Sequence, residues 1–170
     1  MAIGKHKKIW IDRYGRIRDQ RNQMFKAFTR PEIEAEWLTT RPNKHQWAVD
    51  EIIRHLLFSE IRYVQQSFDP TRSPHPAGLR AAWEEDIVEE LEEGEHIEVK
   101  DLKKMFPPVE VATEELLREA ADMDFERTVK APWGAKLRVF KLLNDWYDHE
   151  QYHRGQAYFV LHYFQGPTDY

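Results

Sequence analysis

Apolar residues recur at intervals of three and four along most of this chain, and that spacing restricts the folds open to it. An α-helix returns to the same face about every 3.6 residues, so each such segment carries one apolar face. Few stretches alternate apolar and polar residues over the length of a strand. We therefore predict an all-α protein, with helices of bundle length over residues 7–28, 49–68, 113–125 and 135–164.

Four amphipathic helices of this kind typically bury their apolar faces against one another in a four-helix bundle. The connecting segments 71–78 and 93–112 are too long for simple turns between antiparallel helices, which predicts at least one long crossover. A chain of 170 residues is also the size of one domain, so residues 1–170 are expected to form a single domain.

The middle of the chain carries an acidic insert, at residues 77–108. Ten Asp or Glu residues and one Lys lie between Glu84 and Asp101. The apolar spacing over residues 78–93 predicts a short extra acidic helix there. The pair Pro107-Pro108 then predicts an irregular segment before it, because proline is disfavoured inside a helix.

The composition excludes several kinds of functional site and of partner. The chain has no cysteine, which excludes disulfides, Cys-ligated metals and a catalytic thiol, whereas its eight histidines could bind a metal. The net charge of -5 argues against a nucleic-acid partner. The mean hydropathy is -0.76, and the apolar runs are too short to span a membrane. No long apolar stretch follows the basic residues 1–8 either, so we expect a cytoplasmic protein with no membrane partner.

His149 and His153 lie four residues apart in the last predicted helix, and therefore on one face of it. Trp146 and Val160 share that face, so both imidazoles are expected on the buried stripe, whereas His162 lies off it. A buried polar group without a partner costs about 1–3 kcal/mol. Either each imidazole hydrogen-bonds across the bundle, or the two bind a metal.

A third imidazole would favour the metal. His55 lies at the edge of the apolar face of the predicted 49–68 helix, with the small residues Ala48 and Ser59 on the same side. Three neutral imidazoles leave coordination positions open. Such a site suits zinc or nickel best, with iron or manganese as further candidates.

The residues around these histidines resemble the DinB/YfiT-like superfamily. The matching motifs are Trp47-Ala-Val-Asp-Glu-Ile-Ile-Arg-His55-Leu and Asp148-His149-Glu-Gln-Tyr-His153-Arg-Gly-Gln156, and the similarity extends over about residues 42–164. The resemblance implies a four-helix bundle with a long crossover. It also implies a divalent metal bound by His55, His149 and His153. The family includes thiol-dependent S-transferases, a maleylpyruvate isomerase and metal-dependent hydrolases.

Two positions depart from the family pattern. Ala48 stands where Ser is usual and cannot cap the helix with its side chain, so the cap must come from elsewhere. Asp145 stands where His is frequent; it is either a solvated residue or an acceptor that orients a ligand imidazole.

Four further residues near the histidines have two interpretations each. Glu150 and Glu60 are candidate catalytic bases, because burial raises a carboxyl pKa, but both could be purely structural. Gln156 is a candidate to bond a metal-bound water or an imidazole, or to make a bundle hydrogen bond. Gly155, in the middle of a helix, favours close packing against a neighbour.

These features predict a metal-dependent enzyme acting on a small molecule, by hydrolysis or by transfer of a low-molecular-weight thiol. The alternative is a non-enzymatic, stress-related metal-binding or assembly module. A homodimer is also expected, because the first helix has a wide apolar stripe including Trp10 and Tyr14, while Ile9, Ile11 and Phe25 lie partly outside it. The alternative is a monomer in which the acidic insert folds back over these residues.

Overall fold

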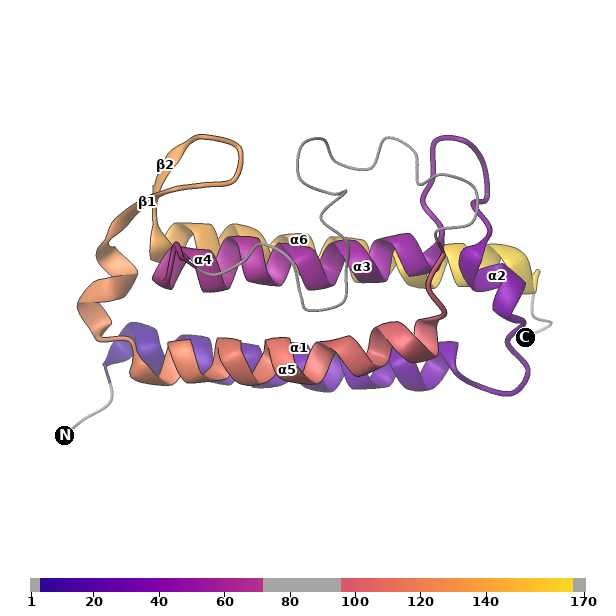
Figure 1. The fold of residues 1–170 in the computed structure, drawn as a ribbon, viewed down its shortest axis with the longest axis horizontal. Coiled ribbons are helices and arrows are strands. Elements are labelled where there is room, and N and C mark those ends of the chain that lie inside the picture. The colour runs from indigo at the N-terminus through magenta and orange to yellow at the C-terminus, as the bar shows by residue number, and fades with distance from the viewer. Residues whose placement is uncertain (1–3, 72–95, 167–170) are drawn as a thin grey trace.

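The computed structural model of this protein describes residues 4–71 and 96–166, which form a bundle of long helices (Figure 1). The first is α1 (Lys5–Phe28). The second is a continuous rod of α3 (Val49–Ser59), η1 (Glu60–Gln65) and α4 (Gln66–Phe68), in which η1 is a π-helical stretch. The others are α5 (Val99–Glu119) and α6 (Val139–Gln165). The predicted all-α four-helix bundle is thereby confirmed.

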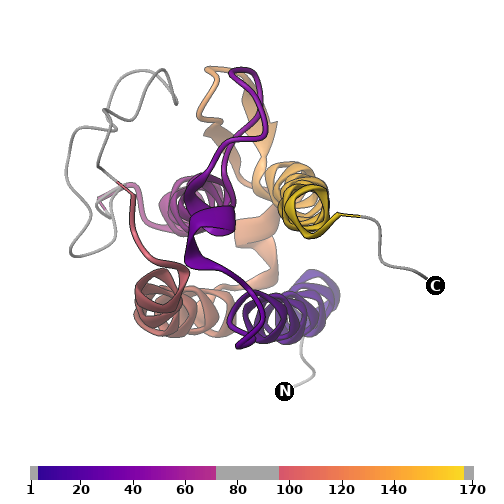
Figure 2. The same ribbon diagram turned by 90° about the vertical axis from the view of Figure 1, so that its right-hand side faces the viewer.

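The helices lie in two layers, α1 with α5 and the α3 rod with α6 (Figure 1). In the end view they occupy the four corners of the bundle (Figure 2). The α3 rod and α5 run in the same direction, so α4 ends at one end of the bundle and α5 begins at the other. Phe68 and Val99 therefore lie at opposite ends of the bundle, as the predicted long crossover requires.

Helix α5 corrects the prediction for the middle of the chain. It begins at Val99 rather than Thr113 and runs through Pro107 and Pro108, where an irregular segment was expected. Both prolines lie on the exposed side, and so do Lys103 and Lys104, whose carbonyl groups lose a backbone donor there. Leu102, Phe106, Val109, Thr113 and Leu117 are buried at spacings of three and four. The helix predicted over 78–93 lies outside the described residues.

Several short elements join the long helices. Helix α2 (Ala35–Thr39) precedes α3, and the 3-10 helix η3 (Asp122–Glu126) follows α5, where the third helix was expected to continue. Strands β1 (Thr128–Lys130) and β2 (Lys136–Arg138) then pair antiparallel, with Val129 opposite Leu137. Over this segment the sequence predicted a connector, followed by a last helix that begins at residue 135 instead of Val139. Three-residue strands are too short to show alternation, and Gly134, at φ 89°, turns the hairpin.

The core consists of two apolar clusters, one toward each end of the bundle. One includes Met24, Leu56 and Phe106, and the other includes Trp10, Trp146 and Phe125. The first helix is therefore covered largely within the chain, and even Phe25 is buried. Large exposed apolar side chains gather instead on α6, at Tyr152, Phe159 and Tyr163. Within the described ranges, each helix is too short or too polar to cross a membrane.

Candidate metal centre

His55 is positioned by the way α3 begins. The carboxylate of Glu51 accepts a hydrogen bond of 2.7 Å from the backbone N–H of Ala48. Arg41 holds that carboxylate through its Nε and Nη2 atoms, the shortest contact being 2.5 Å. This is the half of the capping box that does not need a Ser hydroxyl, and the Ala48 side chain makes no cap hydrogen bond, as expected for this departure from the family motif. His55 follows one turn after Glu51.

The three predicted histidines lie together between α3 and α6. His55 Nε2 is 3.0 Å from His149 Nε2, and one ring nitrogen from each of His55, His149 and His153 lies within 4.8 Å of the others. The four-residue spacing on α6 places His149 and His153 one above the other, with ring centroids 4.3 Å apart. Two helices therefore present three imidazoles to one small volume.

Aromatic rings enclose this cluster. Trp47 stacks on His153 with ring centroids 5.5 Å apart and meets the edge of His55 at 5.0 Å. Tyr63, from η1, stacks on His149 at 5.4 Å, and Trp133 of the β hairpin contacts Tyr63 in turn. The hairpin and the segment joining α2 to α3 project from the same face of the α3–α6 layer (Figures 1 and 2). The two irregular parts of the fold thus supply the two tryptophans.

Burial holds the three imidazoles in their neutral form. Burial, followed by the neighbouring imidazoles of His153 and His149, lowers the pKa of His55 to about 3. Burial and the charge of His153 lower the pKa of His149 to about 4. Burial also lowers the pKa of His153, although Gln156 and Glu150 oppose that shift. Neutral imidazole is the form that binds a metal, so the site is ready to do so near pH 7.

The donor set fits a divalent metal ion. The Nδ1 atoms of His149 and His153 are buried and have no hydrogen-bond partner among the described residues. The bundle supplies one cross-helix contact of hydrogen-bond length, between His55 and His149, and leaves these Nδ1 atoms unsatisfied, so hydrogen bonding within the bundle does not fully account for the buried imidazoles. Three nitrogen donors with a further position open are the ligand set of catalytic zinc sites and suit nickel equally.

Two polar residues beside the cluster have distinct surroundings. Gln156 donates a hydrogen bond of 3.0 Å from its Nε2 to the Tyr152 hydroxyl, and its amide oxygen is buried next to His153. Asp145 instead forms an ion pair with Lys141, one turn earlier on α6. Its charge contributes to raising the pKa of Tyr63, after the larger effect of burial. The carboxylate thus acts on the ring that stacks on His149.

Glu150 and Glu60 are fully buried and belong to an ion-pair layer across the bundle. The Arg21 guanidinium donates to both carboxylate oxygens of Glu150, at 2.8 Å each, and its Nη1 donates to Glu60. The Tyr14 hydroxyl donates to the other Glu60 oxygen at 2.5 Å. Because Arg21 holds both carboxylates away from solvent, this geometry favours the structural interpretation of Glu150 and Glu60.

The charged groups of this layer shift one another's pKa values. Burial by itself would lower the pKa of Arg21, but Glu150 and Glu60 outweigh it and raise that pKa well above its ordinary value. Burial, followed by the charge of Glu60, raises the pKa of Tyr14. Glu110 of α5 lies 3.6 Å from Arg21, and burial raises its carboxyl pKa. All four long helices therefore contribute to one polar layer between the two apolar clusters.

Gly155 of α6 does not pack closely against a neighbour, as the sequence had predicted it would. A Cβ atom added to Gly155 would meet nothing within 4 Å, so the predicted close packing at this residue is wrong. Gly155 lies on the exposed side of α6, so no contact at this position requires a glycine. His162 is exposed and away from the cluster, as predicted.

Sequence reasoning missed several residues of the site. In the sequence, Trp47 stands out only as the first residue of a motif, and Arg21 interrupts the apolar stripe of the first predicted helix. Tyr63, eight residues and about two helical turns after His55, could have been placed near its face. Trp133 gave no usable signal, because its contact with Tyr63 depends on the hairpin.

Comparisons with known proteins bear on the fold and the family of this chain. No curated protein matches the chain. A crystal structure of the DinB-like protein YjoA from Bacillus subtilis is similar, with a TM-score of 0.63, 14% identity and coverage of 93% of each chain. At that identity the likeness concerns the fold. The family model of the DinB superfamily matches residues 16–157, which include all three clustered histidines. This chain belongs to the DinB superfamily.

Proposed function

We propose that this protein is a metal-dependent enzyme that acts on a small molecule, with His55, His149 and His153 as the ligands of one divalent ion. The observation that carries the proposal is the convergence of three neutral imidazoles from two helices. Zinc or nickel suits these donors best, and iron or manganese are further candidates. A bound ion would supply Lewis acidity, which lowers the pKa of a water or a thiol and polarises a carbonyl group.

The protein's own residues prepare the site for such chemistry. The rings of Trp47 and Tyr63 fix the orientation of His153 and His149 and keep water from one side of each. Gln156 offers a buried amide oxygen as a hydrogen-bond acceptor beside His153. These features support either hydrolysis or transfer of a low-molecular-weight thiol. In both reactions a nucleophile and a small electrophile must be held close together.

Metal exchange with an activity screen tests the proposal. The purified protein is stripped with a chelator and reloaded with zinc, nickel, iron or manganese in turn. Each form is assayed against ester and amide substrates, and against electrophiles in the presence of small thiols. We expect about one ion per chain and turnover that depends on it. Full metal occupancy with no metal-dependent reaction would favour the non-enzymatic metal-binding or assembly module instead.

Three accompanying predictions concern the setting of this activity. We propose a homodimer, now supported by the exposed aromatic residues of α6 rather than by α1. Residues 1–170 are proposed to form a single domain, because both apolar clusters draw on the same four helices. A cytoplasmic location stays a prediction from the sequence.

A further inference from the structure

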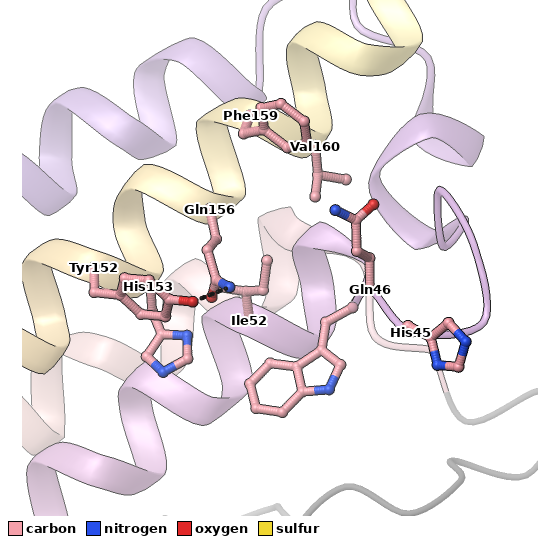
Figure 3. A pocket seen from close by; sticks show the side chains of 9 residues that line it. His45, Gln46, Ile52, Tyr152, His153, Gln156, Phe159 and Val160 are labelled. Carbon is pink, nitrogen blue, oxygen red and sulfur yellow. Dashed lines mark hydrogen bonds between the residues drawn. The ribbon is translucent and has the colours of Figure 1, made fainter.

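A cavity of about 190 Å³ lies directly beside the histidine cluster. Its walls come from the segment before α3, the first turn of α3 and one side of α6 (Figure 3). His153 belongs both to this lining and to the cluster, so a molecule in the cavity would lie next to a candidate metal ligand. The complete lining is His45, Gln46, Trp47, Ile52, Tyr152, His153, Gln156, Phe159 and Val160.

The lining is aromatic and free of acidic and strongly basic side chains. Trp47, Tyr152 and Phe159 contribute rings, Ile52 and Val160 contribute aliphatic surface, and no Asp, Glu, Lys or Arg is among the nine residues. A charged ligand group would lose its hydration here without an opposite charge in the wall. An apolar cavity of about 150 Å³ accepts benzene, so this volume suits one ring with a short substituent.

Two amide side chains give the cavity its polarity. The Gln46 amide oxygen accepts a hydrogen bond of 2.8 Å from Asn43. The Gln156 amide oxygen is buried and has no hydrogen-bond partner among the described residues. A buried acceptor without a partner is unfavourable, and a ligand N–H or O–H group would satisfy it. Figure 3 shows Gln156 beside His153, which also belongs to the cluster, and beside the Tyr152 hydroxyl.

We propose that this cavity binds an uncharged, single-ring molecule, or the corresponding part of a larger substrate, that carries an N–H or O–H group. The ring lies among Trp47, Tyr152 and Phe159, and its donor group bonds Gln156 next to His153. This inference rests on the proposed function and names its substrate class: small, neutral and largely apolar electrophiles. The wall offers no acidic or strongly basic side chain to pair with a charged ligand group inside the cavity.

The test compares three one-ring probes on the full-length protein at pH 7: neutral benzamide, anionic benzoate and cationic benzylamine. Binding is measured by NMR titration before and after chelation. The metal-free form is used to compare charges, because a carboxylate could bind the metal directly. We expect benzamide to bind at least about tenfold more tightly than either ion, because the wall cannot compensate a charge. Equal or tighter binding of benzoate or benzylamine to the metal-free protein would overturn the proposal.

Two matched variants locate the site. Phe159 and Tyr163 are both aromatic, 58% exposed and on α6, but only Phe159 lines the cavity. Phe159→Asp should weaken benzamide binding by at least about tenfold, and Tyr163→Asp should change it by less than about twofold. Unchanged benzamide binding to Phe159→Asp would show that the ring binds elsewhere.

Metal content, measured on the same samples, separates this inference from the proposed function. Benzamide binding that follows the pattern above in a protein without stoichiometric metal would support the cavity and reject the metal-dependent enzyme. Stoichiometric metal with metal-dependent turnover, but no benzamide binding, would reject the cavity proposal and leave the enzyme standing.

Discussion

Glu150 and His153 lie one turn apart on α6 and face different partners. Glu150 is fully buried and receives both hydrogen bonds of the Arg21 fork, whereas His153 turns toward His55, His149 and the cavity. The Glu150 charge nevertheless raises the pKa of His153 and opposes the effect of burial. The ion-pair layer and the candidate metal centre are therefore adjacent and electrostatically linked, although their hydrogen bonds are separate.

Removing one predicted ligand should affect metal binding more than folding. His153→Ala is expected to lose stoichiometric metal, because two imidazoles from two helices hold an ion far more weakly than three. The far-UV circular dichroism should stay helical, since the apolar clusters hold the bundle together. Metal analysis of the purified variant checks this, with His162→Ala as the matched control on the exposed part of α6. Full occupancy in His153→Ala would mean that His153 is not a ligand.

Breaking the ion-pair layer should destabilise the fold strongly. Arg21→Met leaves Glu60 and Glu150 buried without their partner, and a change of this kind costs about 3–5 kcal/mol. Urea denaturation should show this loss, whereas Arg16→Met, at an exposed position of the same helix, should change the free energy of unfolding by less than about 0.5 kcal/mol.

The companion variant removes the charges together. Replacing Arg21, Glu60 and Glu150 all by Met should recover much of the lost stability, because apolar groups can replace a buried ion pair at little cost. A single Arg21→Met variant as stable as the wild type would contradict the layer described above.

The metal-free protein should lose stability as the pH falls. The folded-state pKa values of His55 and His149 are about 3 and about 4, below the value of about 6.5 expected in an unfolded chain. The unfolded state therefore binds more protons between these values, and the free energy of unfolding falls as the pH drops from about 6.5 toward 4. Above pH 6.5 both imidazoles are neutral in the folded and the unfolded states, so they add no further pH dependence to the free energy of unfolding.

Urea midpoints of the chelated protein between pH 4 and pH 8 measure this dependence. His149→Asn should flatten it, because one of the two strongly shifted groups is gone. A midpoint that does not change between pH 6.5 and pH 4.5 would show that these imidazoles are not protected from protonation.

Gly155→Ala should stabilise the protein. The position is exposed and helical with open space around it, so alanine removes the conformational cost of glycine, about 0.5–1 kcal/mol, without a steric penalty. Gly15→Ala in α1 is the control, since an added Cβ there also meets nothing within 4 Å. Both should raise the urea midpoint. A loss of stability in Gly155→Ala alone would indicate a close contact at α6, such as a partner subunit.

Association should depend on the aromatic residues of α6. Sedimentation equilibrium of the wild type at micromolar concentration is expected to give about twice the chain mass of 20.5 kDa. Tyr163→Asp should shift the equilibrium toward the monomer, because a charge replaces a 58% exposed ring on the proposed contact face. A wild-type mass that stays at that of one chain up to high concentration would reject the dimer.

The parts of the fold that follow from local periodicity could be predicted, and the parts that depend on distant contacts could not. The helices containing His55 and His149 have clear spacing, which was enough to find the bundle and to place His149 and His153 on one face. The resemblance to the family motifs joined His55 to them. The start of α5 was missed, although its buried residues follow the same spacing, because two prolines outweighed the pattern. Their position on the exposed face, which makes them tolerable, is visible only once the helix is packed.

The residues of the site divide in the same way, into those that local spacing or a motif identifies and those that depend on distant contacts. Its histidines lie at a four-residue spacing or within a motif, so the sequence contains the information needed to choose them. Arg21 seemed to interrupt an apolar stripe, and its function as the centre of a buried layer depends on carboxylates 39 and 129 positions away. The sequence left Asp145 with two interpretations. Its ion pair with Lys141 is one of several contacts that a residue at this position of α6 could make.

The π-helical stretch η1 has a consequence for comparing this chain with its relatives. A π turn closes hydrogen bonds five residues apart instead of four, so it accommodates an additional residue without a loop. A relative whose corresponding helix is purely α-helical would be one residue shorter between the equivalents of His55 and Phe68. A correct alignment would then place a single-residue gap inside a helix, where gaps are normally penalised, and without that gap Tyr63 would be matched to a residue on another face.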